Sequence, residues 1–393
     1  MDLLGLRFDS SSTYTILSEI GRGGMGIVFL AEKDCEGVTD LVALKTIRTK
    51  SADHEARLKR EANIATGLRH ENVVKTYGLE SVPYERLPAE FLKEFDTLSV
   101  GNARRVALPR VAPGGRLGDP RTRLRLTPGA TRSDRKLYLM AMDYIEGTDL
   151  RAFHHEHTRR DLLIPVPLAA FIVSRVARAL AYAHQFIIHR DISPENVLLN
   201  MQGVVKLSDF GVAVSEGEGG VIGKLSYLAP EQARGEVVDA RADIYALGLV
   251  LYVLLTGIQP LRVPAKLPTE EGVKLVRELH SRRIPAPAEV RTDVPPELSE
   301  ICARMIEADR GRRHASADDV ARDLEQRVLY ARGFGPTNNS MQAYLEIFDG
   351  EFKEATPEQL RQLPFLQGEL KRPVSADRYT GAGLRLLEES RRR

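Results

Sequence analysis

Apolar residues are arranged in two different ways along the chain, and the arrangement changes after the first third. In that third they come in short runs rich in β-branched and aromatic residues, which is typical of β-strands. One segment differs: residues 51–68 carry apolar side chains three or four positions apart, which predicts an amphipathic helix. We expect strands at residues 14–17, 27–30, 41–45, 72–77 and 136–142.

Helical spacing dominates the rest of the chain. Residues 167–185 place their apolar side chains on one face, and residues 340–352 could form another helix. Residues 244–255 are almost wholly apolar, but the run is too short to cross a bilayer and predicts a buried core helix. Residues 197–199 and 204–207 flank a polar turn, which predicts a β-hairpin.

The composition is that of an ordinary globular protein. Apolar residues make up 43% and charged residues 28% of the 393 residues, a length typical of two or three domains. Cys35 and Cys302 give neither a disulfide framework nor a metal-ligand cluster, which fits a reducing compartment. The N-terminus lacks the features of a signal peptide, so we expect a cytoplasmic protein without a transmembrane segment.

Positive charge is concentrated in one segment. Residues 101–136 contain nine Arg and one Lys against two Asp, whereas the whole chain has a net charge of +2. The segment is also rich in proline and glycine and cannot bury much apolar surface, so we expect a flexible insert at about residues 81–135. Such an insert could recruit an acidic partner, nucleic acid or a membrane surface. Its scarcity of aromatic residues argues against nucleic acid.

A glycine-rich turn lies between the first two predicted strands. Gly21, Gly23, Gly24 and Gly26 follow the pattern G-x-G-x-x-G. Glycines allow a backbone to approach phosphate oxygens closely. In dinucleotide-binding folds the same pattern is followed by a helix. Here a strand is expected on both sides, which favours a phosphate-binding hairpin, with an ordinary hairpin as the alternative.

Lys45 ends the third predicted strand, where a buried ammonium group needs an anionic partner. Glu61 shares a helix face with Leu58 and Ala65, so we expect it to point inwards and to pair with Lys45. The alternatives are that Glu55 is the partner, or that Glu61 is solvated.

The most informative stretch is polar and lies between two apolar segments. It reads His-Arg-Asp-Ile-Ser-Pro-Glu-Asn at residues 189–196. Its carboxylate, Asp191, and its amide, Asn196, lie five positions apart, which suits a base and a metal ligand on one loop. A second carboxylate, Asp209, follows the predicted hairpin in the sequence Asp-Phe-Gly. A capped helix end with a polar turn is the alternative interpretation of residues 189–196.

These motifs, in this order, resemble those of protein kinases. Residues 14–329, apart from the insert, are similar to eukaryotic-like (Hanks-type) Ser/Thr protein kinases, and residues 227–235 look most like bacterial members. The resemblance implies an α+β, two-lobed protein-kinase fold, with a small antiparallel β-sheet N-lobe with one main helix and a larger, mostly helical C-lobe. It also implies transfer of the ATP γ-phosphate to protein Ser/Thr hydroxyls, including autophosphorylation, with Mg²⁺ or alternatively Mn²⁺.

The resemblance assigns roles to individual residues. Asp191 would orient or deprotonate the acceptor hydroxyl, while Lys45 and the glycine-rich turn would hold the phosphates. Asn196 and Asp209 would hold the metal ion. The residues that it places around the adenine are Val28, Ala43, Met142, Asp143, Ile145 and Leu198.

The resemblance also suggests a domain organisation and two supporting contacts. We expect an N-lobe at residues 1–145, a C-lobe at 146–331 and a C-terminal extension of undefined role at 332–393. Asp243 would brace the catalytic loop, and Arg313 would pair with Glu231. Both could instead be ordinary capping or surface charges.

Two positions depart from the family pattern. Ser193 stands where Ser/Thr kinases usually have lysine, and Lys224 stands where they usually have threonine. In the family these two side chains approach each other beside the catalytic aspartate. We therefore expect Lys224 to reach Ser193 and Asp191 from a mobile segment and to neutralise the transferred phosphate. The alternative is a solvent-facing Lys224 and a slow enzyme.

Two other functions stay open. A pseudokinase-like scaffold would bind partners through the insert or the C-terminal extension. Intact Lys45, Asp191, Asn196 and Asp209 argue against this scaffold, and Ser193 argues for it. A small-molecule phosphotransferase is disfavoured by the Ala-Pro-Glu sequence at residues 229–231, because in kinases that segment builds a peptide-binding floor.

Overall fold

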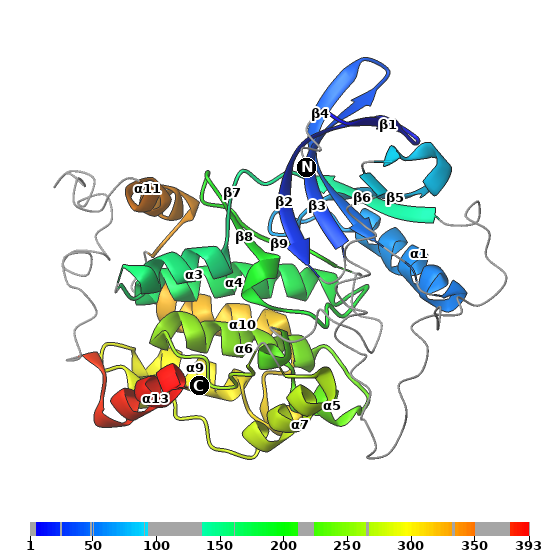
Figure 1. Cartoon of the computed structure of the whole chain (residues 1–393). Helices are drawn as coiled ribbons and strands as arrows, with labels where there is room; N and C mark the ends of the chain where they lie inside the picture. Colours follow the sequence, from blue (N-terminus) through cyan, green and yellow to red (C-terminus); the bar gives the residue numbers. More distant parts are fainter. Residues whose placement is uncertain are drawn as a thin grey trace, which may run out of the picture. The chain divides into compact units, whose positions relative to one another are not determined.

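The chain forms two compact units. The first comprises Met1–Lys59 and Thr76–Tyr144, and the second comprises Arg60–Lys75 and Ile145–Arg393 (Figure 1). Gly24 and most of the predicted insert lie outside the described residues. The computed structural model describes residues 5–23, 26–47, 49, 51–89, 91–92, 136–160, 162–210, 224–264, 267–331, 335–349 and 378–392.

The first unit is built on a six-stranded antiparallel sheet in the order β1-β2-β3-β4-β6-β5. Its apolar face buries Ile16, Phe29 and Leu44 completely. Helix α1 (Ala52–Gly67) begins where the Ser51 hydroxyl accepts a hydrogen bond from the His54 amide at 3.2 Å. The strands are β1 (Arg7–Asp9), β2 (Thr13–Gly23), β3 (Gly26–Cys35), β4 (Val38–Ile47), β5 (Thr76–Pro83) and β6 (Lys136–Asp143).

The predicted start of the insert at residue 81 is too early. Strand β5 continues to Pro83 and pairs with β6 along its length, and a 3₁₀ turn at Tyr84–Arg86 follows it. Val82, Leu87 and Phe91 are buried in the core of this sheet. The insert was predicted from the arginine-rich composition of residues 101–136. These apolar residues come before that part of the segment, so its composition did not indicate that they pack in the core.

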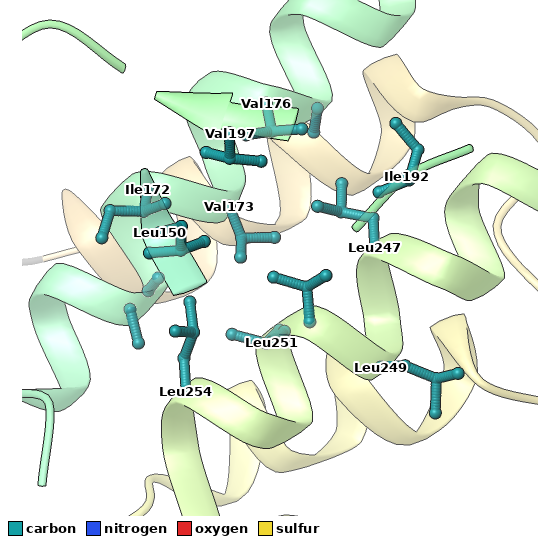
Figure 2. Packing of buried hydrophobic residues seen from close by; sticks show 14 of the residues in the cluster. Leu150, Ile172, Val173, Val176, Ile192, Val197, Leu247, Leu249, Leu251 and Leu254 are labelled. Carbon is teal, nitrogen blue, oxygen red and sulfur yellow. The ribbon is translucent and has the colours of Figure 1, made fainter. Parts of the chain in front are cut away.

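The second unit is mainly helical, and its core lies between α4 (Val166–Ala183) and α6 (Arg241–Thr256). In Figure 2, Val173 on α4 faces Leu251 on α6, and Val176 lies beside Val197. All four side chains are buried. The second unit also contains the helices α3 (Leu150–Arg159), α5 (Pro230–Arg234), α7 (Thr269–His280), α8 (Pro287–Val290), α9 (Pro296–Met305) and α10 (Ala317–Asp323).

A small antiparallel sheet lies in the second unit, with strands β7 (Gly147–Asp149), β8 (Val197–Asn200) and β9 (Val205–Leu207) in that order. Strands β8 and β9 confirm the predicted hairpin. The backbone around Leu207 also bonds to Asn72 and Val74, at 2.8 and 2.9 Å. The predicted strand at residues 72–77 therefore begins only at Thr76, because the residues before it pair with β9 instead.

Two helices of the C-terminal extension are part of the second unit. Helix α11 (Asn338–Asp349) buries Tyr344, whose hydroxyl lies 2.6 Å from His157 Nε2 on α3. Before helix α13 (Gly381–Arg392), the Tyr379 hydroxyl donates a hydrogen bond to the Thr256 carbonyl oxygen at 2.9 Å. The extension is therefore bound to the core of the second unit at two places.

Within the described residues, one helix is long and apolar enough to cross a membrane. It is α4 (Val166–Ala183), and 72% of it is buried inside the protein. Burial of this kind is expected of the core helix of a globular unit, so length and composition alone are weak evidence for a membrane span.

Candidate active site

Asp243, in the first turn of α6, holds the loop at residues 189–196. Its carboxylate accepts hydrogen bonds from the backbone amides of His189 and Arg190, at 2.8 and 2.7 Å, and from His184 Nε2 at 2.8 Å. Arg190 has a φ of 64°, a left-handed conformation that residues other than glycine rarely adopt. The two backbone bonds hold this loop in place, and the third joins Asp243 to His184 at the end of α4. The predicted bracing contact of Asp243 is confirmed.

Asp191 and Asn196 are bonded to each other across the loop. Asn196 Nδ2 donates to the carbonyl oxygen of Asp191 at 2.7 Å and to its Oδ2 at 3.2 Å. The Asn196 side chain is buried. Because the amide nitrogen supplies both bonds, the amide oxygen is the Asn196 atom that suits a cation.

Asp209 is tied to the same loop through its neighbour Ser208. The Ser208 amide and hydroxyl both donate to the Asn196 carbonyl oxygen, at 2.8 and 3.1 Å. His189 Nε2 donates to the Ser208 carbonyl oxygen at 2.8 Å, and the Phe210 ring packs edge-on against His189. Asp209 itself has a φ of 65°. One hydrogen-bonded network thus fixes a carboxylate and an amide, which are the ligand types that Mg²⁺ takes.

Lys224 contacts Asp191, on the loop at residues 189–196. It opens the 3₁₀ turn Lys224–Tyr227, and its Nζ forms an ion pair with Asp191 Oδ2. The next residue, Leu225, is buried against Val263, whose amide donates to the Ser226 hydroxyl at 3.2 Å. The residues that directly follow Lys224 are therefore packed against the second unit, whereas residues 211–223 of the segment that we expected to be mobile lie outside the described residues.

Ser193 lies on the same loop as Asp191 and is buried, with 1% of its surface exposed. Among the described residues its hydroxyl has no hydrogen-bond partner. The structure thus brings Lys224 to Asp191. Among the described residues no hydrogen bond joins Lys224 to the Ser193 hydroxyl.

A buried ion pair stabilises the segment that follows Lys224. Both Arg313 terminal nitrogens donate to the Glu231 carboxylate, at 2.7 and 2.8 Å, and both side chains are almost fully buried. Burial is the largest influence on Glu231 and opposes its ionisation, but the hydrogen bonds and charge of Arg313, together with a backbone hydrogen bond, lower the pKa of this carboxyl overall. The predicted pairing is confirmed, and it fixes α5 to the body of the second unit.

The other predicted site residues of the first unit lie on the sheet. Lys45 on β4 is 7% exposed and stands opposite Val28 on β3 and Met140 on β6. In the same register, Ala43 stands opposite Met142, and both are buried. The sheet therefore places Lys45 two residues after Ala43 on one strand.

Glu61 lies on α1, in the part of the helix that belongs to the second unit, whereas Lys45 belongs to the first. Their pairing stays a prediction. Asp143 ends β6, and its carboxylate accepts a hydrogen bond from the Tyr77 hydroxyl at 2.7 Å. Ile145 and Leu198 are half-buried residues of the second unit.

Of the glycines of the predicted phosphate-binding turn, Gly21, Gly23 and Gly26 are described and lie at the ends of β2 and β3. Gly21 pairs with Val28, and Gly23 pairs with Gly26. Gly26 has a φ of 151°, and a Cβ there would lie 1.9 Å from the carbonyl oxygen of Thr46. Close packing therefore requires glycine at this position, independently of any role in binding phosphate.

The sequence interpretation missed one contact beside Asp191. Glu195 Oε1 forms an ion pair with Arg151 Nη1 on α3 at 2.6 Å, and Glu195 Oε2 is buried without a partner in the described part of the chain. No local pattern could have indicated the pair, because 44 residues separate its members.

Comparison with known proteins identifies related sequences along most of the chain. A protein kinase domain model matches residues 127–324, and a protein tyrosine and serine/threonine kinase model matches residues 14–92. The serine/threonine-protein kinase PknB of Mycolicibacterium smegmatis is 31% identical over 80% of this chain and 43% of its own length. The serine/threonine-protein kinase PrkC of Bacillus subtilis is 30% identical over 82% of this chain and 41% of its own length.

A third relative is named for a different acceptor specificity. The tyrosine-protein kinase MasK of Myxococcus xanthus is 36% identical over 48% of this chain and 30% of its own length. The chain therefore spans less than half the length of each of these relatives. Among solved structures, a mutant of the Mycobacterium tuberculosis PknI kinase domain matches with a TM-score of 0.54 at 25% identity, over 82% of this chain and 97% of that chain.

Proposed function

The chain belongs to the protein kinase family, and on that premise we propose that it transfers the γ-phosphate of ATP to serine and threonine hydroxyls of proteins, its own included. The observation that carries the proposal is the network that joins Asp191, Asn196 and Asp209 through Ser208. Phosphoryl transfer needs a hydroxyl-orienting carboxylate beside metal ligands, held in fixed geometry.

Asp191 orients the acceptor hydroxyl and takes its proton while the hydroxyl oxygen bonds to phosphorus and the bond to ADP breaks. The Asn196 amide oxygen and the Asp209 carboxylate would hold a divalent ion, for which we propose Mg²⁺, with Mn²⁺ as an alternative. When bound with the nucleotide, such an ion neutralises phosphate charge. Asp243 keeps Asp191 in position through the loop backbone.

We propose the nucleotide contacts from the family resemblance and the sheet geometry together. Lys45, paired with Glu61, and the turn containing Gly21, Gly23, Gly24 and Gly26 hold the phosphates. The apolar side chains enclose the adenine, and backbone groups of the segment after β6 bind its edge. The residues proposed for the adenine site are Val28, Ala43, Met142, Asp143, Ile145 and Leu198.

Incubation of the purified protein with γ-radiolabelled ATP tests this proposal, with the protein itself and casein as acceptors. We expect labelled phosphoserine or phosphothreonine from the wild type and a loss of about 10²-fold or more for Asp191→Ala. Asp40→Ala, an exposed acid on β4, is the matched control and keeps the wild-type rate. Label in tyrosine alone, the specificity for which MasK is named, would overturn the choice of acceptor.

A pseudokinase-like scaffold is the second candidate, and the ion pair between Lys224 and Asp191 is the observation that favours it. If the ammonium group stayed on Asp191, it would lower the proton affinity of the carboxylate and weaken it as a base. This alternative predicts a nucleotide-dependent thermal shift without transfer of label to any acceptor.

The remaining proposals concern partners and domain organisation. We propose protein substrates, an acidic partner for the arginine-rich insert, no role for nucleic acid, and a cytoplasmic location. The domain boundaries stay at residues 1–145, 146–331 and 332–393 as predictions. The buried residues of α11 support describing the last of these as an extension packed on the second unit.

A further inference from the structure

We propose that Lys224 is a catalytic residue that supplies, from the segment preceding α5, the positive charge that neutralises the transferred phosphoryl group. This inference rests on the proposed function and adds a residue outside the catalytic loop. Its starting observation is the contact of Lys224 Nζ with Asp191 Oδ2, in which the two side chains are 24% and 10% exposed.

The position of Asp191 fixes where the phosphoryl group must pass. The acceptor hydroxyl lies within hydrogen-bond reach of the base, at about 3 Å. In a near-attack arrangement its oxygen is about 3–3.5 Å from phosphorus, in line with the leaving oxygen. We infer that an ammonium group that already contacts the base can reach the equatorial oxygens when its side chain rotates. There, charge neutralisation lowers the barrier in the transition state.

The backbone beneath Lys224 is built to hold that charge in place. Leu225 is 1% exposed and packs with Val263 and Val276. Ser226 is buried as well, and its hydroxyl accepts the hydrogen bond from the Val263 amide. Anchored in this way, Lys224 can transfer its ammonium group from Asp191 to a phosphate oxygen by side-chain rotation alone.

The catalytic loop itself carries no cation between Asp191 and Asn196: its side chains there are Ile192, Ser193, Pro194 and Glu195. Glu195 is an acid, and Ser193 is a buried hydroxyl without a partner among the described residues. An ammonium group near the transferred phosphate must come from another segment, and Lys224 is in contact with the base.

Exchanging the side chains of Ser193 and Lys224 gives a direct test. We compare steady-state kcat and KM for ATP in the wild type, Lys224→Ala, Lys224→Thr, Ser193→Lys, and the double variant Ser193→Lys/Lys224→Thr. We expect Lys224→Ala and Lys224→Thr to lower kcat by about 10²-fold, as removal of one charge-stabilising donor does, with a smaller change in KM. Lys274→Ala, an exposed lysine on α7, should leave kcat unchanged.

The double variant returns the lysine to the catalytic loop and should recover at least about tenfold in kcat over Lys224→Thr. A kcat for Lys224→Ala within about twofold of the wild type would overturn the inference while leaving the proposed function intact. An inactive wild type would instead contradict the proposed function.

A second measurement needs no acceptor and shows whether each variant is folded and binds nucleotide. Thermal shift is recorded with ADP and Mg²⁺, then with aluminium fluoride added as a planar mimic of the transferred group. We expect wild type and Lys224→Ala to shift equally with ADP, and only the wild type to gain a further shift with aluminium fluoride. Equal gains in both proteins would overturn the inference.

Discussion

The carboxylate of Asp243 accepts a hydrogen bond from the backbone amide of Arg190 at 2.7 Å, although the two residues lie 53 positions apart. Arg190 holds a strained left-handed conformation directly before Asp191. Strain of this kind persists only where the surroundings impose it. The bond to Asp243 on α6 therefore fixes the backbone that carries Asp191, the predicted catalytic carboxylate.

Replacing Asp243 by Asn should therefore damage catalysis and stability together. The amide oxygen cannot accept all three bonds that the carboxylate takes from His189, Arg190 and His184. We expect a loss of about 1–3 kcal/mol in unfolding free energy and a larger effect on kcat than on KM. Urea unfolding and steady-state kinetics measure both. Asp309→Asn, an exposed acid, is the control, and equal effects of the two substitutions would contradict the bracing role.

The Glu231–Arg313 pair makes a prediction about stability alone. Both side chains are almost fully buried, so Glu231→Ala leaves an uncompensated buried charge on Arg313. We expect a loss of about 3–5 kcal/mol in the free energy of unfolding. The exposed pair between Arg234 and Glu236 provides the matched comparison, and Glu236→Ala should have far less effect. Similar unfolding midpoints for the two variants in urea would refute the assignment.

Helix α11 should be required for stability of the second unit. Phe348 and Tyr344 are buried in the same core as α4 and α6. Phe348→Ala removes a large buried ring and should cost about 3–5 kcal/mol. Glu346 on the exposed face of α11 is the control. If thermal unfolding of Phe348→Ala matched that of Glu346→Ala, the helix would not be docked as described.

A pH dependence follows from His157. Burial is the main reason that its pKa is lowered to about 3 from a reference value of 6.5. Below pH 6.5 the unfolded chain binds a proton that the folded chain does not, so stability falls as the pH drops towards 3. The slope is up to about 1.4 kcal/mol per pH unit.

His157→Phe should make this slope shallower while keeping the ring stack with Tyr344 and Phe348. Burial also lowers the pKa of His154, to about 4, so the His157→Phe variant should retain part of the slope. The exposed His155 supplies the control as His155→Gln. Unfolding free energies measured between pH 4 and 7 that run parallel for wild type and His157→Phe would contradict the prediction.

The sequence predicted the fold class because the decisive signals were local. The α+β, two-lobed protein-kinase fold is confirmed by the solved relative, together with the antiparallel sheet and the helical second unit. Two apolar runs on either side of a polar turn indicated β8 and β9, and helical spacing indicated α1 and α4, all to within a few residues. Strand β5 was misplaced at both ends, because Asn72 pairs with β9 and Val82 packs in the core of the sheet.

The supporting contacts of the site were less accessible to sequence reasoning. The Glu231–Arg313 and Asp243 contacts came from resemblance, since their members are far apart in the chain. Glu195–Arg151 had no local signal at all. The anchoring of Lys224 depends on Leu225 packing against Val263, which only the folded chain brings together.

Transfer of label from γ-radiolabelled ATP, with phosphoamino-acid analysis of wild type and Asp191→Ala side by side, tests the central claim most directly. We predict label in serine or threonine from the wild type, almost none from the variant, and the same nucleotide-dependent thermal shift in both. A wild type that gains neither label in any acceptor nor a thermal shift with ATP and Mg²⁺ would contradict the account.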